Sequence, residues 1–236
     1  RPCSGTNRVA PVSVDGTLTP EQQAYNAASA GKRSDAIADA VRRGVPNASH
    51  LTLLDYGCGP GHIGLRLADH FGTVVMVDSD PAAVELVRAT VADRENITVA
   101  VMDACSDNAP TPHADVVVAS LSLHHVSDVG RVLDGLARVA PGGRLFVFDM
   151  DFDGGAYHAA EPEFAHIVGF DRAGLVRTVT AHGYQDVTIG DLWESTKWIG
   201  GRLTPMSLFL LTATVPASPA HKLVHHRPGI SRADRC

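Results

Sequence analysis

Short apolar runs alternate with segments of helical spacing along the middle of the chain. The runs are five or six residues long, and they cover residues 51–55, 73–78, 97–101, 115–120 and 144–149. Helical spacing marks the segments 61–70, 81–93 and 128–140. Strands without a polar face must be buried on both sides, as in a parallel sheet covered by helices on both faces. The pattern therefore predicts an α/β fold.

This alternation ends at residue 150 and is absent before residue 51. Residues 1–18 are rich in Gly, Pro, Ser and Thr and predict an irregular arm, and residues 216–236 predict a flexible tail. Thr19 and Pro20 are a helix-start signal for an N-terminal helical cap over 19–44, which we expect Gly31 to divide into two helices. The remaining predictions are a single domain over 19–215, a helix over 171–182, strands over 186–189 and 206–215, and loops over 150–170 and 191–205.

The composition narrows the classes of partner. Of the 236 residues, 44% are hydrophobic and 19% are charged, which is typical of one domain with a substantial core. A formal net charge of −6 provides no broad basic face, so we expect neither nucleic acid nor an anionic membrane as partner. The longest apolar run is about half the ~20 residues of a membrane helix. The first residues contain no apolar signal-peptide core, and the four cysteines form no Cys-x-x-Cys pair, so we expect a reducing, cytoplasmic compartment.

A glycine loop follows the first predicted strand, with the sequence DYGCGPGHIG over residues 55–64. Two registers of this loop are open. The spacing Gly59-x-Gly61-x-x-Gly64 satisfies the dinucleotide fingerprint, whereas Gly57-x-Gly59-x-Gly61 places Asp55 two residues before the first glycine. A carboxylate at that point repels a pyrophosphate and tolerates a cationic ligand. The second register is therefore favoured.

Acidic residues end three successive strands of the predicted sheet. Asp55 ends the first strand, Asp78 ends the second, and Asp103 follows the third. Because the carboxyl ends of neighbouring parallel strands meet at one edge, these side chains are expected to share a crevice. A carboxylate at Asp78 can accept hydrogen bonds from both hydroxyls of a ribose, and Asp103 can accept from an adenine amino group.

The sequence LLDYGCGPGHIGLRLA resembles the first motif of class I S-adenosylmethionine-dependent methyltransferases. The resemblance continues through VVMVDSD, VMDA, DVVVASLSLHHVSDV and PGGRLFVFDMD, and GFDRAGLVRTVTAHGYQDVTI with FLLTAT resembles small-molecule members related to the quinone-biosynthesis enzymes. It implies a Rossmann-like seven-stranded sheet of order 3-2-1-4-5-7-6, with strand 7 antiparallel, and S-adenosyl-L-methionine as cofactor. The cofactor-binding residues it implies are Asp55, Gly57, Cys58, Gly59 and Gly61 around the methionine part, Asp78 and Ser79 at the ribose, Asp103 and Ala104 at adenine, and Ser120 and Leu121 at the amino-acid end.

Residues for the methyl acceptor are less clearly marked, because the sulfonium is already a good leaving group and the protein mainly aligns the reactants. The candidates are His124 and His125 after the fourth strand, and Asp151 and His158 after the fifth. Trp193 and Trp198 are expected between the last two strands, either above a pocket or at the core edge. The spacing of these groups matches no metal signature, so no metal site is predicted.

Three functions remain open from the sequence. The first is methyl transfer to a small organic acceptor, favoured because ASLS over residues 119–122 replaces the Asn-Pro-Pro-Tyr type motif of nucleic-acid enzymes of this fold. The second is an NAD(P)-dependent oxidoreductase, against which there is no Tyr-x-x-x-Lys pair after the fourth strand. The third is a protein that binds a cofactor or a partner without catalysis.

Overall fold

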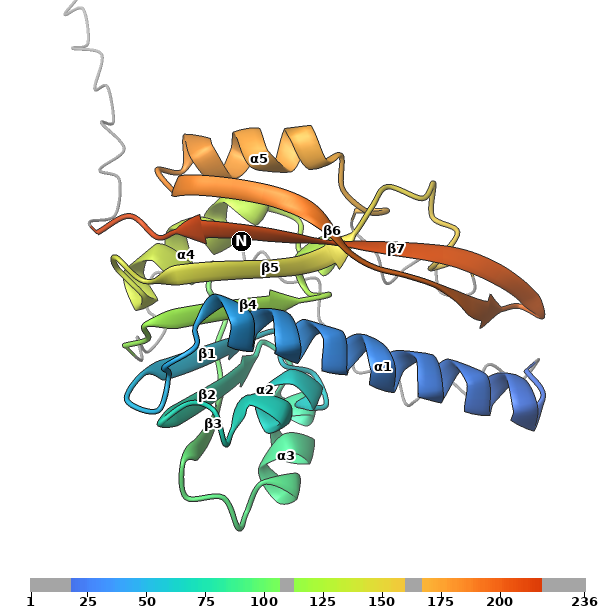
Figure 1. Ribbon diagram of the computed structural model, residues 1–236, viewed down its shortest axis with the longest axis horizontal. Helices are drawn as coiled ribbons and strands as arrows, with labels where there is room; N and C mark the ends of the chain where they lie inside the picture. The colour runs from blue at the N-terminus through green and yellow to red at the C-terminus, as the bar shows by residue number, and fades with distance from the viewer. Residues whose placement is uncertain (1–17, 107–112, 160–166, 218–236) are drawn as a thin grey trace, which may run out of the picture.

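A single seven-stranded sheet forms the centre of the protein. The computed structural model describes residues 18–106, 113–159 and 167–217. The strand order is β3-β2-β1-β4-β5-β7-β6, with β7 antiparallel to both of its neighbours (Figure 1), which confirms the predicted topology. The strands are β1 (Thr52–Tyr56), β2 (Thr73–Asp78), β3 (Ile97–Val101), β4 (Val116–Ser120), β5 (Arg144–Met150), β6 (Gln185–Ile199) and β7 (Arg202–Thr214).

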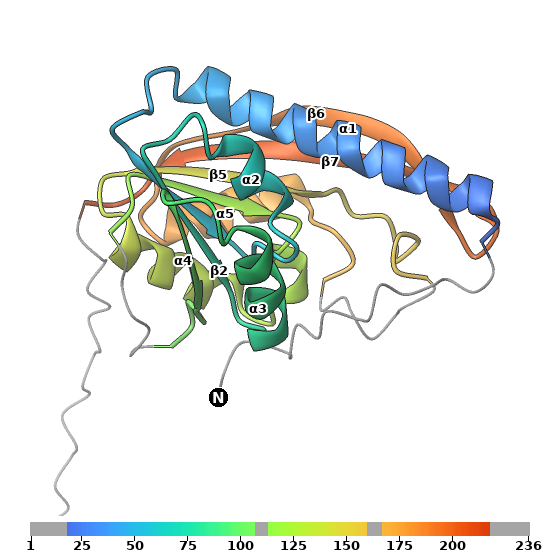
Figure 2. The ribbon, with the colours of Figure 1, turned by 90° about the horizontal axis from the view of Figure 1, so that it is seen from below.

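Helices cover both faces of this sheet, as the continuous apolar strands predicted (Figure 2). On one face lie α1 (Pro20–Gly44), α2 (His62–Leu67) and α3 (Pro81–Thr90), and on the other lie α4 (Val129–Val139) and α5 (Arg172–Ala181). Alternate residues of β5 divide between the two cores: Phe146 and Phe148 face α1, and Leu145 and Val147 face α4. The predicted helix starts agree within one residue, but α2 and α3 end three residues earlier than expected.

The N-terminal helix is continuous, and the predicted division at Gly31 is wrong. Thr19 caps the helix as expected, and its hydroxyl accepts from the backbone N–H of Gln22. A glycine in a helix costs about 1 kcal/mol relative to alanine. Contacts on both sides of Gly31 offset that cost, because Ile37 is buried against the sheet and Asn26 hydrogen-bonds to β6.

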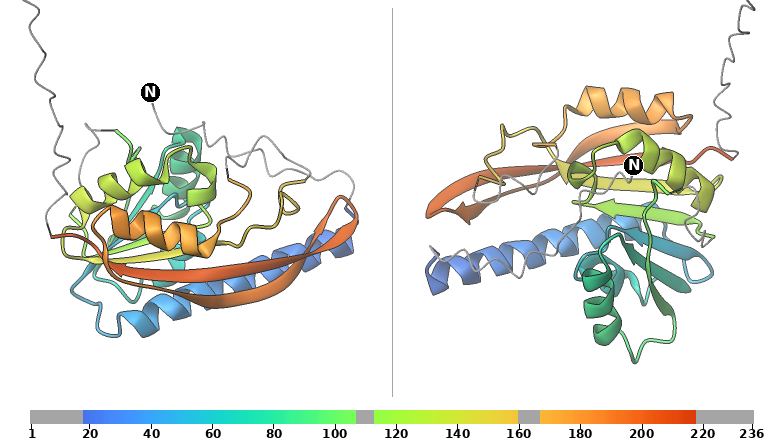
Figure 3. Two further views of the ribbon diagram at one scale, coloured as in Figure 1. Left: turned by 90° about the horizontal axis from the view of Figure 1, so that it is seen from above. Right: turned by 180° about the vertical axis from the view of Figure 1, so that it is seen from behind.

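Residues 191–205 form a hairpin, where the sequence predicted a loop. β6 and β7 pair from Gln185 with Thr214 to Ile199 with Arg202, and Gly200 and Gly201 have positive φ in the turn. Trp193 and Trp198 therefore lie within β6, and their predicted place between the strands is wrong. The hairpin extends past the end of the sheet alongside α1 (Figure 3), so the tertiary contact with α1 stabilises strands whose own sequence is only weakly patterned.

Polar contacts join this hairpin to α1. The Tyr25 hydroxyl lies 2.7 Å from the Thr196 hydroxyl, and Ser29 lies 2.8 Å from Ser195, oxygen to oxygen. Asn26 donates to the carbonyl of Trp198 at 2.9 Å and accepts from its N–H at 2.8 Å. Helix α1 and the hairpin thus form one covering layer. Among the described helices, none combines the length and apolar character that a bilayer crossing requires.

Candidate functional site

The glycine loop turns from β1 into α2 at the carboxyl edge of the parallel strands. Gly57, Gly59 and Gly61 all have positive φ, a conformation that side chains other than glycine rarely adopt. The backbone N–H groups of Gly57 and Cys58 donate to the Val77 carbonyl at 2.9 and 3.0 Å, which fixes the loop against β2. A Cβ on Gly57 would lie 2.5 Å from the Cβ of Ser122, whereas the space beside Gly59 is open. The loop therefore exposes bare backbone at Gly59.

Asp55 lies beneath this loop and is only 1% exposed. Its Oδ2 atom accepts a hydrogen bond from the backbone N–H of Gly64 at 2.9 Å, which ties the start of α2 to the end of β1. Burial raises the pKa of Asp55 to about 7, although the Gly64 hydrogen bond opposes the shift and the negative charge of Asp78 adds to it. Burial, and to a smaller extent the charges of Asp55 and Asp78, raise the pKa of the Cys58 thiol, so this cysteine is not a reactive thiolate.

Asp78 ends β2 and Asp103 follows the end of β3, and the structure places both at the same edge as Asp55. The two carboxylate oxygens of Asp78 accept from the backbone N–H groups of Gly59 at 2.9 Å and Asp80 at 3.0 Å. Asp78 is buried, and burial is the main cause that raises its pKa. Asp103 accepts from the N–H of Cys105, with Ala104 buried beside it, and Ser79 is half-buried at the start of the next turn.

The chain bends sharply where β4 ends at Ser120. Leu121 has a φ of 52°, and its N–H donates to the Phe148 carbonyl at 2.7 Å. A left-handed conformation in a branched side chain costs about 1–3 kcal/mol and is concentrated at functional sites. Ser122 donates to the carbonyl of Tyr56 at 3.2 Å, so this bend is fixed against the glycine loop.

A buried histidine–carboxylate pair follows this bend. The Nδ1 atom of His124 lies 2.7 Å from Oδ1 of Asp149, and these side chains are 2% and 0% exposed. The second oxygen of Asp149 accepts from the backbone N–H of Leu123. Sequence reasoning selected His124 but missed Asp149 as its partner. The available signal was that β4 and β5 are neighbours, so an acid ending β5 reaches a histidine that follows β4.

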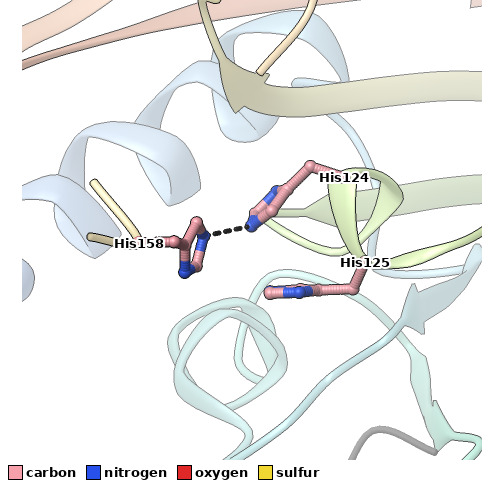
Figure 4. Close-up of side chains that lie close together, drawn as sticks. All are labelled: His124, His125 and His158. Carbon is pink, nitrogen blue, oxygen red and sulfur yellow. Dashed lines mark hydrogen bonds between the residues drawn. The ribbon is translucent and has the colours of Figure 1, made fainter. Parts of the chain in front are cut away.

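Three imidazoles meet beside this pair, as Figure 4 shows. The Nε2 atoms of His124 and His158 are 3.2 Å apart, and the ring of His125 lies 3.9 Å from that of His124, centroid to centroid. Burial, together with the neighbouring imidazoles and Lys197, lowers the pKa of His158 to about 4. The structure therefore brings together three of the four residues that the sequence selected for the acceptor.

The fourth candidate, Asp151, lies apart from the imidazoles in an ion pair. Arg172 donates to both of its oxygens, at 2.6 and 2.7 Å, and Ser207 donates to one at 2.8 Å. The hydrogen bonds from Arg172 hold the pKa of Asp151 below its usual value despite burial. Asp151 lines a cavity of about 400 Å³ with Met150, Met206 and Ser207. Both of its oxygens already accept hydrogen bonds from the protein. Asp151 is therefore a weaker candidate than the histidines for binding the methyl acceptor.

Basic and aromatic side chains from distant parts of the chain gather beside His158. The Nζ atom of Lys197 lies 4.2 Å from the centre of the Tyr157 ring. Burial raises the pKa of Tyr157, but the charges of Lys197 and Arg33 and their hydrogen bonds outweigh it and leave the pKa below its usual value. Arg33 also contacts Met206, against which Trp193 packs. The sequence did not predict this group, because its members lie on α1, the loop after β5, and β6.

Comparison with known proteins gives the family of the central part of the chain. Residues 54–147 match the model of a methyltransferase domain family. Residues 54–147 form a methyltransferase domain. The match covers the glycine loop, the acids of β2 and β3, the His124 segment and most of β5. S-adenosylmethionine is accordingly the cosubstrate of this domain.

Curated relatives of this methyltransferase domain match about half of the chain. An uncharacterized methyltransferase of Mycobacterium bovis is 34% identical over 116 residues, which are 48% of this chain and 55% of the relative. An uncharacterized methyltransferase of Schizosaccharomyces pombe is 28% identical, over 47% of this chain and 42% of the relative. The trans-aconitate 2-methyltransferase of Mycolicibacterium gilvum is 28% identical, over 63% of this chain and 67% of the relative. The chain thus spans only about half the length of the first two relatives.

Solved structures share the fold at low sequence identity. A putative methyltransferase from Bacillus halodurans superposes with a TM-score of 0.64 at 14% identity, covering 76% of this chain and 98% of that chain. The [4+2]-cyclase SpnF superposes with a TM-score of 0.61 at 20% identity, covering 78% and 82%. These likenesses support the architecture of the methyltransferase domain, and they show that the architecture alone does not determine the reaction.

Proposed function

We propose that the protein transfers the methyl group of S-adenosylmethionine to a small organic acceptor. The observation that carries the proposal is the covering layer of α1 and the β6–β7 hairpin over the acceptor side of the crevice. Arg33 of α1 and Lys197 of β6 both reach Tyr157, and the next residue, His158, reaches His124 at the end of β4. A site bounded on these sides fits a ligand of limited size and excludes a polymer.

In this proposal the glycine loop and the strand-end acids bind the cofactor. Gly57, Gly59 and Gly61 approach the methionine part with bare backbone, Asp78 accepts from the ribose hydroxyls, and Asp103 lies at the adenine. Ligand hydroxyls at Asp78 would share an oxygen that now accepts from Gly59. The buried Asp55 supports the loop from below and supplies negative charge beneath a cationic ligand. The reaction is an in-line displacement, for which alignment and exclusion of water are the main requirements.

The acceptor that best fits the site carries an acidic group. The Nε atom of Arg33 and the Nε1 atom of Trp193 are the buried side-chain donors that have no hydrogen-bond partner among the described residues. Leaving a buried donor unpaired costs about 1–3 kcal/mol, so a ligand that accepts from both gains that free energy back. With Lys197 nearby, a carboxylate or phosphate is the matching group. The relative from Mycolicibacterium gilvum is named for trans-aconitate, which is a carboxylate.

The two other hypotheses are less well supported. An NAD(P)-dependent oxidoreductase does not account for the match of residues 54–147 to a methyltransferase domain. Binding without catalysis is the weaker hypothesis because residues 54–147 match a methyltransferase domain, and the transfer assay below separates the two. The resemblance to the quinone-biosynthesis subgroup stays a prediction. We also propose a reducing, cytoplasmic compartment, which fits the burial of the Cys58 and Cys105 side chains.

The experiment is a transfer assay with methyl-labelled S-adenosylmethionine and the acceptor fractions of a cell extract. We expect label in small acids that an anion exchanger retains, and none in protein or nucleic acid. The variant Arg33→Gln should lower this transfer at least about tenfold while cofactor affinity is unchanged, because one charge-assisted contact is lost. Lys32→Gln, at an exposed neighbour on α1, is the matched control. Label found only in macromolecules would overturn the proposal.

A further inference from the structure

The imidazoles of His124, His125 and His158 form a cluster whose geometry suits a metal ion. Each offers one ring nitrogen, and these three atoms all lie within 4.8 Å of one another. His124 and His125 come from the short turn after β4 (Leu123–His125), whereas His158 comes from the loop after β5 (Figure 4). The three rings thus come from two different segments of the chain.

We propose that His124, His125 and His158 bind one divalent transition-metal ion. Two nitrogen ligands at 2.0–2.1 Å from a tetrahedral ion are about 3.3 Å apart. The Nε2 atoms of His124 and His158 are 3.2 Å apart, which matches that separation. The third nitrogen, from His125, lies within 4.8 Å of the other two.

A hydrogen bond to Asp149 orients the His124 ring in the way that is usual for a metal-binding histidine. With Nδ1–H donated to Asp149, the Nε2 atom presents its lone pair toward His158. Histidine ligands in metal sites almost always donate their other N–H to a carboxylate or carbonyl, which fixes the tautomer and orientation. Asp149 is fixed in turn by the backbone N–H groups of Leu123 and Met150.

The loop that carries His158 is also held in place. Asp153 accepts hydrogen bonds from the backbone N–H groups of Gly155 at 2.8 Å and Tyr157 at 2.7 Å. Tyr157 is covered by Lys197 from β6. These contacts place the His158 ring against the turn after β4, so little conformational entropy remains to be lost when a metal binds.

The donor set determines the class of metal. Three neutral imidazoles suit zinc, cobalt, nickel or copper, whereas magnesium and calcium require oxygen ligands. Three protein ligands leave a fourth tetrahedral position open, as in catalytic zinc sites. This inference rests on the proposed function only in the role of that open position, which would take a polar atom of the acceptor. Metal binding itself is measurable without any transfer reaction. The proposal differs from the sequence analysis, which predicted no metal site.

The test is a titration of the chelator-treated, full-length protein with Co²⁺ and then Zn²⁺. Visible absorption reports tetrahedral Co²⁺, and calorimetry reports the stoichiometry of Zn²⁺. His158→Ala and His125→Ala remove one ligand each, and His50→Ala at an exposed position is the matched control. The triple variant His221→Gln, His225→Gln, His226→Gln removes the histidines near the C-terminus as an alternative source of binding.

We expect one equivalent of Zn²⁺ per chain, tetrahedral Co²⁺ absorption, and no binding of Mg²⁺. Affinity for Zn²⁺ should fall at least about tenfold in His158→Ala and His125→Ala and stay unchanged in the two controls. S-adenosylmethionine binding should be unchanged in all variants, so a loss of methyl transfer and a loss of metal are observed separately. Zn²⁺ binding that survives both alanine variants, or that disappears with the C-terminal histidines, would overturn the proposal. Absence of binding in the parent protein would overturn it as well.

Discussion

The Oδ1 atom of Asp149 accepts a hydrogen bond from Nδ1 of His124 at 2.7 Å, with both side chains almost completely buried. This pair joins the ends of β4 and β5 beneath the acceptor side of the site. Removing one member of a buried, hydrogen-bonded pair leaves the other polar group without a partner in a low-dielectric environment. The pair therefore affects stability as well as the orientation of the imidazole.

The variant Asp149→Ala should lower the free energy of unfolding by about 3–5 kcal/mol, because it leaves the His124 ring unpaired. Urea denaturation followed by circular dichroism measures this change. Asp39→Ala is the control, since Asp39 pairs with Arg42 on the exposed face of α1 and such pairs contribute about 0–1 kcal/mol. Equal effects of the two variants would contradict the importance of the buried pair.

The variant Asp78→Ala should weaken binding of S-adenosylmethionine by about 2–4 kcal/mol, because two charge-assisted hydrogen bonds to the ribose are lost together. Isothermal calorimetry gives the affinity, and Asp93→Ala at an exposed position is the control. An affinity within about twofold of the parent protein would show that Asp78 does not bind the ribose.

Asp55 makes the stability of the unliganded protein depend on pH. Its pKa is about 7 in the fold against an ordinary value of 3.8, because burial disfavours the carboxylate. The folded state therefore holds a proton that the unfolded state releases, and the stability present below pH 4 is lost as the pH rises through 7. The slope is at most about 1.4 kcal/mol per pH unit.

Asp55→Asn should remove this slope and raise stability at pH 8, since an amide oxygen can still accept from Gly64. Urea unfolding of both proteins from pH 4 to pH 8 measures the difference. The account of Asp55 would be wrong if the variant kept the same pH dependence as the parent protein.

Asn26 joins α1 to the hairpin through two hydrogen bonds to Trp198. Asn26→Ala should lower the free energy of unfolding by about 1–3 kcal/mol and reduce methyl transfer more than cofactor binding, because it loosens only the acceptor side. Hydrogen exchange of β6 amides and the transfer assay measure the two effects. Lys32→Ala, on the same helix and exposed, should change neither.

The cofactor side of the site could be predicted from the sequence for a physical reason. Asp55, Asp78 and Asp103 lie at or just after the ends of three neighbouring strands, and parallel strands bring their carboxyl ends to one edge, so order along the chain determines proximity. The glycine loop is equally local, because the positive φ values of Gly57, Gly59 and Gly61 are properties of the turn itself. The topology was predicted by the resemblance, not by the apolar pattern alone.

The acceptor side could not be predicted because its residues meet only through tertiary structure. Arg33, Tyr157 and Lys197 lie on three segments that are far apart in the chain. The hairpin was missed because the polar residues of β6 give a weak strand pattern, and its pairing with α1 decides its conformation. Gly31 misled the helix prediction for the same reason, since contacts on both sides outweigh its low helix propensity.

The most direct test of the central claim is a calorimetric titration of the purified protein with S-adenosylmethionine, with its demethylated product, and with NAD. The account predicts that both S-adenosyl ligands bind with dissociation constants in the micromolar range and that NAD does not bind. Binding of NAD without binding of either S-adenosyl ligand would contradict it.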